Sequence, residues 1–446
     1  MNDRVSGYDV EIPAEWTLER VRDLTSRVGS GITPRGGSDV YQTEGVLFIR
    51  SQNVRFEGLN LSDVAYIDRK THRSMDGSKA MPFDVLLNIT GASIGRCCVL
   101  PSGLGDVNVN QHVCTVRLEQ VTQQDAEFLS SALASPIGQN QIFRLNAGGN
   151  REGLNYEQLR AIEVPWPRPN ERRKIARILT TVDNLIEKTE ALIAKYQAIK
   201  QGMMHDLFTR GVDSSGQLRP TQQQAPDLYK QSELGWIPKE WDEDTLGNIC
   251  TWMSGGTPSK SNESFWRGTI PWVSPKDMKV FEISDSEDHI SEEAARVGTR
   301  RVPAGTVLIV IRGMILAHSF PVAITTRDVT FNQDMKSLCF DDAETGRFVA
   351  HWFVAHRAKM VALATASSHG TKRFDLADVY SIPIGMPTKT ERKRIVERID
   401  SLDSNRKAEE QYLSKLRTQK SGLMQDLLTG RVRVKVDETE EVAAHA

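Results

Sequence analysis

Long apolar runs are missing from this sequence, and cysteine is scarce. The N-terminal residues contain no hydrophobic stretch that could serve as a signal peptide or cross a membrane. The five cysteines (Cys97, Cys98, Cys114, Cys250 and Cys339) are too few and too unevenly spaced for the disulfide framework of a secreted protein. These absences predict a cytoplasmic protein with no membrane segment.

A strong charge of either sign is also missing. The 446 residues carry a formal net charge of -2, which argues against a chain that is basic throughout and binds nucleic acid over its whole surface. Local basic patches remain compatible with this total, because the acidic residues after Val436 offset cations elsewhere. The charge therefore leaves DNA binding open.

Sequence signatures of catalysis are missing as well. The chain has neither a glycine-rich phosphate-binding loop nor a dinucleotide-binding fingerprint, and it lacks the Asn-Pro-Pro-Tyr type of motif that adenine methyltransferases place against a flipped base. Metal-binding patterns are also absent: Cys97 and Cys98 are adjacent, and His351 and His356 would lie on different faces of a helix. The sequence predicts no catalytic, cofactor or metal site in this chain.

What the sequence does have is a long, proline-free helical segment that occurs twice. Residues 170–212 align without a gap with residues 390–432, so that Glu171 corresponds to Glu391. Apolar residues recur in the first copy at alternating intervals of three and four positions, which is typical of a coiled coil. About 40 residues at about 1.5 Å each make a rod about 60 Å long, which needs a partner along its length. We expect the two copies to pair as an antiparallel coiled coil.

The predicted helix-helix seam consists of apolar and aromatic positions. In the first copy these are Ile175, Ile178, Val182, Leu185, Leu192, Tyr196, Ile199 and Met203. In the second copy they are Ile395, Leu402, Leu416 and Leu423. The second copy is more polar, with Arg398 at the position of Ile178 and Gln419 at that of Ile199. Self-pairing of the first copy should be tighter, since polar groups buried without partners cost about 1–3 kcal/mol each.

The repeat extends beyond the helices, which indicates a domain duplication. Motifs recur in the same order in both halves, for example Asn110-Gln111 and Asn332-Gln333. The predicted organisation is a first globular domain (1–169), the first long helix (170–212), an exposed linker rich in Ser, Gln, Gly and Pro (213–235), a second globular domain (236–389), the second long helix (390–432) and a disordered acidic tail (433–446).

Each globular domain is predicted to be mixed but mainly β. Short apolar or β-branched runs, such as residues 46–49, 85–89 and 307–311, are bounded by Gly, Asn, Asp and Pro, as strands are. Prolines before each long segment prevent a helix from beginning earlier in the chain. Asn170 and Thr390 are predicted to be the N-caps of the two long helices. The fold class is therefore α+β, a tandem duplication of a mainly β domain followed by a long helix.

Polar residues stand at the turns between the predicted strands. Arg, Lys, Asn and Gln offer donors and acceptors that match base edges, and glycine-rich turns let the backbone approach phosphate. A solvated loop is the competing interpretation for each of them. The candidate DNA-binding residues are Arg50, Gln52, Asn53, Arg55, Thr90, Ser93, Arg96, Asn110, Gln111, His112, Asn150, Arg151, Lys276, Arg312, Asn332, Gln333, His369, Lys372 and Arg373.

Further motifs recur or stand near the domain starts: residues 232–238 with Trp241, residues 255–258, and residues 93–96 followed by Asn110-Gln111. Together with the repeat, these motifs resemble those of the specificity subunits of type I restriction-modification systems. The resemblance covers nearly the whole chain. Family members usually carry Glu-Gln where the long helices begin, whereas this chain has Glu171-Arg172 and Glu391-Arg392, a departure that affects local contacts alone.

The resemblance implies a non-catalytic protein that binds double-stranded DNA through two target-recognition domains and reads a split, asymmetric site. It also implies two methyltransferase subunits bound along the helices and, in the full assembly, two ATP-dependent nuclease-translocase subunits. S-adenosylmethionine, ATP and Mg²⁺ would then belong to these partners. Two other classes stay open: a stand-alone or fused restriction or methylation enzyme, and a coiled-coil scaffold without a DNA role.

Overall fold

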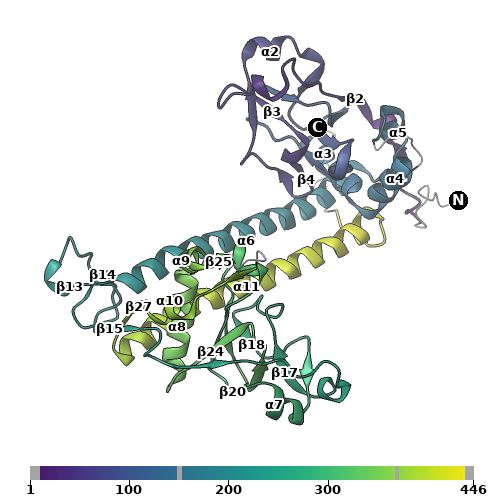
Figure 1. Ribbon diagram of the computed structural model, residues 1–446. Helices are drawn as coiled ribbons and strands as arrows, with labels where there is room; N and C mark the ends of the chain where they lie inside the picture. The colour runs from purple at the N-terminus through teal and green to yellow at the C-terminus, as the bar shows by residue number, and fades with distance from the viewer. Residues whose placement is uncertain (1–10, 148–152, 367–370, 437–446) are drawn as a thin grey trace. The chain divides into compact units, whose positions relative to one another are not determined.

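The computed structural model describes residues 11–147, 153–366 and 371–436. The chain divides into two compact units: unit 1 consists of Met1–Leu192 with Glu409–Ala446, and unit 2 of Ile193–Ala408. Each unit combines one globular domain with one half of each long helix (Figure 1). No described helix is long and apolar enough to span a membrane.

The globular part of unit 1 is built on two four-stranded sheets. One contains, in spatial order, β6 (Ala65–Ile67), β3 (Val46–Ile49), β10 (Val107–Val109) and β7 (Lys79–Ala80); the other contains β2 (Thr25–Ser30), β11 (Val113–Leu118), β8 (Val85–Asn88) and β9 (Cys97–Val99). Strands β3 and β10 are parallel, and the other neighbours are antiparallel. Two antiparallel pairs are added: β1 (Thr17–Arg20) with β12 (Glu163–Trp166), and β4 (Val54–Arg55) with β5 (Gly58–Leu59).

Successive side chains along a strand point to opposite faces of the sheet, so the core of unit 1 is divided between the two faces. Leu86 of β8 packs in one apolar cluster, while its neighbours Val85 and Leu87 pack in another. The adjacent cysteines of β9 divide in the same way, and burial raises the pKa of the Cys97 and Cys98 thiols to about 12. All five cysteines of the chain are free thiols.

Helices cover one face of this sheet. α3 (Gln123–Ala134) packs on β8 and β9 and is followed by α4 (Pro136–Ala147). The hydroxyl of Thr122 accepts a hydrogen bond from the Asp125 amide and so caps α3. The shorter helices are α1 (Val21–Leu24), α2 (Arg69–Arg73), α5 (Tyr156–Arg160) and the 3-10 helices η1 (Gly37–Val40), η2 (Ser51–Asn53), η3 (Asp76–Ser78) and η4 (Gly91–Ser93).

Unit 2 repeats this plan. One sheet contains β19 (His289–Ile290), β17 (Ile270–Val273), β23 (Val329–Phe331) and β20 (Arg301–Val302); the other contains β16 (Thr251–Ser254), β24 (Met335–Cys339), β21 (Val307–Val310), β22 (Val322–Thr325) and β18 (Glu282–Ile283). β17 and β23 are parallel, like β3 and β10, and β15 (Asp242–Thr245) pairs with β27 (Pro383–Met386) as β1 does with β12. The sequence repeat is therefore a duplication of the fold, and the predicted α+β class is confirmed.

The remaining elements of unit 2 are short. Two further antiparallel pairs are β13 (Tyr229–Ser232) with β14 (Gly235–Pro238), and β25 (Thr365–Ala366) with β26 (Lys372–Arg373). The helices are α7 (Glu292–Gly298), α8 (Ala343–Ala355), α9 (Arg357–Leu363), α10 (Leu376–Tyr380), and the 3-10 helices η5 (Pro226–Leu228), η6 (Glu263–Trp266) and η7 (Met314–Ala317).

The two long helices are α6 (Pro169–Thr209) and α11 (Lys389–Leu428). Both begin one residue before the predicted starts and end three or four residues before the predicted ends. The predicted caps Asn170 and Thr390 are wrong, because both residues lie inside the helices. Pro169 suits the first helical position, where no amide hydrogen is needed, and the hydroxyl of Thr388 accepts a hydrogen bond from the Glu391 amide.

Ion pairs within each unit show how the helices run. In unit 1, Asp183 of α6 pairs with Lys420 of α11 at 2.5 Å, and Glu190 pairs with Arg417 at 2.6 Å. Residue numbers rise along one helix as they fall along the other, so the pairing is antiparallel. In unit 2 the equivalent pair, Lys200 with Asp403, is also 2.5 Å long.

The predicted seam is covered unevenly. Ile175, Ile395 and Leu416 are buried, whereas Leu185 and Ile199 are 39% and 42% exposed. The other seam residues are half-buried: Ile178, Val182, Leu192, Tyr196, Met203, Leu402 and Leu423. Leu185 and Ile199 are therefore wrong as buried seam positions. The first long helix also packs on its globular domain, where Leu179 is part of the apolar core, and Ile186 is buried as well.

Two segments predicted to be loose are docked. In the predicted linker, Arg219 is 5% and Tyr229 is 3% exposed, so that the description as an exposed linker is wrong for these residues. At the start of the predicted disordered tail, Arg433 pairs with Glu171 at 2.6 Å and Val434 packs on the core of unit 1. Residues 437–446 of the tail lie outside the described residues.

Candidate nucleic-acid interface

In unit 2, the carboxyl ends of two parallel strands bring distant loops together. β17 ends at Val273 and β23 at Phe331, and the Asn332 amide donates to the Val273 carbonyl at 2.9 Å. The Gly256 amide donates to the Phe331 carbonyl at 2.9 Å. A side chain at Gly255 would place its Cβ 2.3 Å from that carbonyl oxygen, so this close approach requires glycine.

The loop after β21 joins the same cluster. The Ile311 amide donates to the Asp334 carbonyl at 2.9 Å, and the Gly313 amide donates to the Lys372 carbonyl at 2.9 Å. Arg312 and Asp334 form an ion pair beside these bonds. The loops that follow β16, β17, β21 and β23 thus form one polar cluster with β26, which we call the unit 2 loop cluster.

Unit 1 has an equivalent cluster, called the unit 1 loop cluster. The Asn110 amide donates to the Ile49 carbonyl at 2.9 Å, and the Ile89 amide to the His112 carbonyl at 3.0 Å. The backbone of Thr90 forms an isolated antiparallel β-bridge with that of Gly153. In unit 2, Arg312 and Arg373 form the equivalent backbone bridge. The duplicated fold therefore places the duplicated polar turns at equivalent positions.

Several candidates in unit 1 use their polar atoms to hold the loops. Asn53 is 2% exposed; its amide group donates to two backbone carbonyls, and its side-chain oxygen accepts from the Arg50 amide. Asn110 is 7% exposed and accepts from the His112 amide. Arg50, Thr90, Ser93 and His112 are half-buried. Exposed members of the set are Gln52, Arg55, Arg96 and Gln111.

The unit 2 candidates divide in the same way. Lys276 is held by Glu287 and Asp288, at 3.0 and 2.9 Å, and its hydrogen bonds to Asp288 and Glu287 raise its pKa. Asn332 accepts from the Asp334 amide, and Gln333 accepts from Thr257. Arg312 and Arg373 are exposed, and Lys372 is half-buried. Three further candidates, Asn150, Arg151 and His369, lie outside the described residues.

Sequence reasoning missed two features of the unit 2 loop cluster. Asp334 is the counter-ion of Arg312, a pairing across 22 residues that no local pattern reveals. Met314 and Ile315 are 65% and 39% exposed directly after Gly313. Their apolar character predicts burial, but they lie exposed at the start of the 3-10 helix η7.

A buried polar network in unit 2 ties α8 to α11. His351, Asp400 and Asp403 bring potential ligand atoms within 4.8 Å of one another. Cations already hold both carboxylates, since Arg347 pairs with Asp400 and Lys200 with Asp403. Burial lowers the pKa of His351, whose Nε2 lies 2.9 Å from Asp400. This donor set is that of an ion-pair network rather than of a metal site.

The start of each long helix is held by a buried carboxylate. In unit 1, Glu171 accepts hydrogen bonds from the Trp16 indole at 3.0 Å and from Arg433. In unit 2, Glu391 accepts from the Trp241 indole at 3.1 Å and from Arg219. Both indoles are buried in the core, so neither tryptophan is exposed for stacking on a base.

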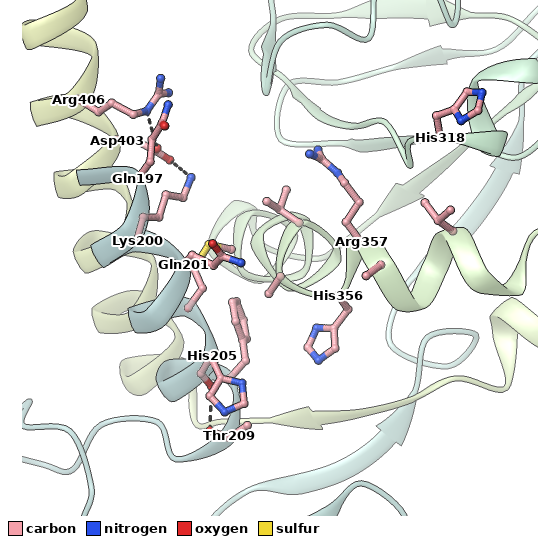
Figure 2. Close-up of a pocket in the computed structure, with 16 residues that line it drawn as sticks. Gln197, Lys200, Gln201, His205, Thr209, His318, His356, Arg357, Asp403 and Arg406 are labelled. Carbon is pink, nitrogen blue, oxygen red and sulfur yellow. Dashed lines mark hydrogen bonds and ion pairs between the residues drawn. The ribbon is translucent and has the colours of Figure 1, made fainter. Parts of the chain in front are cut away.

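A groove of about 960 Å³ lies in unit 2 between α6 and the α8–α9 corner (Figure 2). Met204 and Phe208 are among its lining residues, and both are buried. Its polar lining is rich in cationic and imidazole groups, and Asp403, its one described carboxylate, is already paired with Lys200. The basic and imidazole lining residues are Lys200, His205, His318, His356, Arg357 and Arg406.

The matches to known proteins reflect the duplication, because one family model matches the chain twice. A family model described as the type I restriction modification DNA specificity domain matches residues 76–197 and 238–418. A type I restriction enzyme specificity subunit from Escherichia coli is 30% identical over 252 residues, 56% of this chain and 57% of that protein, so the match spans little more than half of either. The MjaX specificity subunit from Methanocaldococcus jannaschii is 23% identical over 447 residues, 95% of each chain.

Solved structures share the fold. The S subunit of a type I restriction-modification system from M. genitalium has a TM-score of 0.58 at 16% identity, covering 94% of this chain and 96% of that one. A structure of the type I R-M system, described in terms of complex assembly and conformational transition, has a TM-score of 0.51 at 14% identity, covering 95% and 100%. At these identities the likeness concerns the fold.

Proposed function

Since the chain belongs to the family of type I restriction-modification specificity subunits, we propose that it reads a bipartite, asymmetric DNA site, one half-site for each unit. The observation that supports this is the pair of equivalent loop clusters on a duplicated fold. Each cluster gathers exposed cations and amides at strand ends, the donors and acceptors that base edges and phosphates require. Because the two clusters carry different side chains, the half-sites should differ in sequence.

The long helices serve, in this proposal, as the platform for two methyltransferase subunits, with two nuclease-translocase subunits added in the full assembly. The groove in unit 2 suits an amphipathic segment of the methyltransferase, with apolar anchors over Met204 and Phe208 and carboxylates facing the basic lining. S-adenosylmethionine, ATP and Mg²⁺ are assigned to these partners, so methylation and cleavage would be theirs.

Exchange of one reading domain tests the division into half-sites. Replacing residues 236–386 by the corresponding domain of another family member should change one half-site and leave the other intact. Mapping methylated bases after co-expression with the methyltransferase measures both. A change in both half-sites would contradict independent reading.

The two rival classes give different results. A stand-alone enzyme would cleave or methylate DNA when the purified chain alone receives Mg²⁺ and S-adenosylmethionine. A scaffold without a DNA role would leave the complex with the methyltransferase unable to discriminate one DNA sequence from another. Introducing Glu at His205 and Arg357 should weaken methyltransferase binding if the groove holds an acidic segment. Arg267→Glu is the control, because Arg267 is not among the groove residues.

A further inference from the structure

The ion pair between Arg312 and Asp334 occupies one edge of the Arg312 guanidinium. Arg312 donates from Nε to Asp334 Oδ1 at 2.7 Å, and its Nη2 contacts the same carboxylate. A guanidinium has five N–H donors in one plane, so the edge formed by Nη1 and the outer Nη2 hydrogen remains. Nη1 makes no hydrogen bond to any other residue that the structure describes. The Arg312 side chain is 55% exposed, whereas that of Asp334 is 27% exposed.

The backbone around this pair is held from two sides. The Asp334 carbonyl accepts hydrogen bonds from the amides of Ile311 and Arg312, at 2.9 and 3.3 Å. Arg312 also forms a bridge with Arg373, and the Phe374 amide donates to the Ile311 carbonyl at 3.0 Å. Because backbone and side chain are both restrained, Arg312 loses little freedom when it binds a ligand.

The ligand that fits a fixed guanidinium edge is a pair of acceptors at its spacing. In the DNA major groove, guanine presents O6 and N7 side by side, and bidentate arginine is the commonest specific contact to this pair. Phosphate is the competing ligand, but a phosphate contact does not require a carboxylate that fixes the orientation of the arginine. The adjacent cations Lys372 and Arg373 are better placed for phosphate, since they add charge without such a buttress.

Unit 1 fills the equivalent positions with different chemistry. Thr90 takes the place of Arg312 and His112 that of Asp334, and Thr90 Oγ1 lies 2.5 Å from His112 Nδ1. This pair has no guanidinium, so unit 1 lacks a bidentate cation at this position. We infer that Arg312, oriented by Asp334, reads a guanine in the half-site bound by unit 2, and that unit 1 reads its half-site without an equivalent contact.

This inference rests on the proposed function and is tested on the full chain in complex with its methyltransferase. Binding selection from a randomised DNA library gives the preferred sequence of the wild type, Arg312→Ala, Arg312→Lys and Asp334→Asn. Arg312→Ala and Arg312→Lys should lower the preference for guanine at one position of one half-site by roughly 5- to 150-fold. Lysine keeps the charge but not the planar fork, so it should fail as well.

Asp334→Asn separates positioning from folding. Without the carboxylate, Arg312 keeps its charge but not its orientation, so the ratio of specific to non-specific affinity should fall while non-specific affinity is kept. A folding defect would lower both affinities. Arg267→Ala is the matched control. Arg267 pairs with Glu263 and precedes the first residue of β17, whereas the loop cluster follows the last residue of that strand, so this variant should leave the selected sequence unchanged.

Substitution of the DNA base identifies the atoms involved. Replacing the selected guanine with 7-deazaguanine removes N7 but keeps O6, so the affinity advantage of the wild type over Arg312→Ala should shrink. Unchanged guanine preference in Arg312→Ala, with the wild type still selective, would overturn this inference and leave the proposed function standing. A wild-type complex that selects no sequence would instead overturn the proposed function.

Discussion

At the scale of single residues, the buried carboxylates at the starts of the long helices differ in their counter-ions. The Arg219 side chain beside Glu391 is 6% exposed, whereas the Arg433 side chain beside Glu171 is 43% exposed. A cation that loses its partner in the interior keeps its desolvation cost, while an exposed cation returns to water. Removing either of these two equivalent glutamates should therefore lower the free energy of unfolding by different amounts.

Glu391→Ala should destabilise the start of α11 by about 3 kcal/mol, the lower end expected for breaking a buried pair, because Glu240 still contacts Arg219. Glu171→Ala should cost less. Hydrogen exchange in the first turns of α6 and α11, with urea unfolding, measures both effects. Glu263→Ala, which breaks an exposed pair, serves as the control at about 0–1 kcal/mol. Equal losses in both helices would contradict the role given to arginine burial.

The stability of unit 2 should fall on mild acidification because of His351. Burial lowers its pKa in the folded state, so the unfolded state takes up the proton first. Stability should therefore be full above the unfolded pKa, about 6.5, and decline below it. The charged groups that act on the His351 ring are Asp400, Lys200 and Arg347. Burial opposes ionisation of Asp400, but its hydrogen bonds to His351 and Arg347 lower its pKa in the folded state, so it stays charged over this pH range.

Urea unfolding at pH 7.5, 6.5 and 5.5 measures this dependence. The His351→Gln variant should be less stable at pH 7.5 but should show a smaller decline between pH 6.5 and 5.5. A slope equal to that of the wild type would show that another group carries the effect.

At the scale of elements, charged pairs set how the two long helices align in each unit. Lys200 with Asp403 and Asp183 with Lys420 are equivalent under the repeat, and all four side chains are at least 74% buried. Burial raises the pKa of Asp183 in spite of Lys420, which shows how costly the charge is there. These pairs specify alignment more than they add stability.

Exchange of the two charges tests this alignment role. Lys200→Asp and Asp403→Lys should each destabilise unit 2 by about 3–5 kcal/mol, since each leaves like charges buried together. The double variant should recover much of the loss, and urea unfolding of all four proteins gives the coupling energy. Additive losses would show that the pair is not coupled.

At the scale of the whole molecule, the duplication predicts that half of it can assemble with itself. Residues 1–230 should form a homodimer, because α6 would meet a second α6 at the positions that α11 occupies. Asp183 would then pair with Lys200 of the partner subunit, and Glu171 with Arg219 of the partner subunit. The C-terminal half should dimerise less tightly, since Arg398 and Gln419 replace apolar residues of α6.

Analytical ultracentrifugation of both halves measures this difference. With the methyltransferase, the N-terminal dimer should modify an inverted repeat of one half-site, since both reading units are identical. An N-terminal half that is monomeric at micromolar concentration would contradict this prediction.

The sequence by itself determined the duplication, the α+β class, the long helices and the family. Each depends on signals that are local or repeated: an apolar period of three and four, short β-branched runs between turn residues, and motifs that recur in the same order. Those predicted turns that the structure describes come together in one cluster in each unit, because they follow strands that the sheets place side by side.

The tertiary structure alone decided which residues of these patterns are covered. Periodicity marks an apolar stripe, but packing on the globular domain buries Leu179, while Leu185 is left 39% exposed. Composition marks a polar turn, but hydrogen bonds turn Asn53 inward, and an ion pair across 22 residues orients Arg312 outward. Exposure and hydrogen-bond partners depend on segments far away in the chain, and these meet only when the sheets and helices have packed.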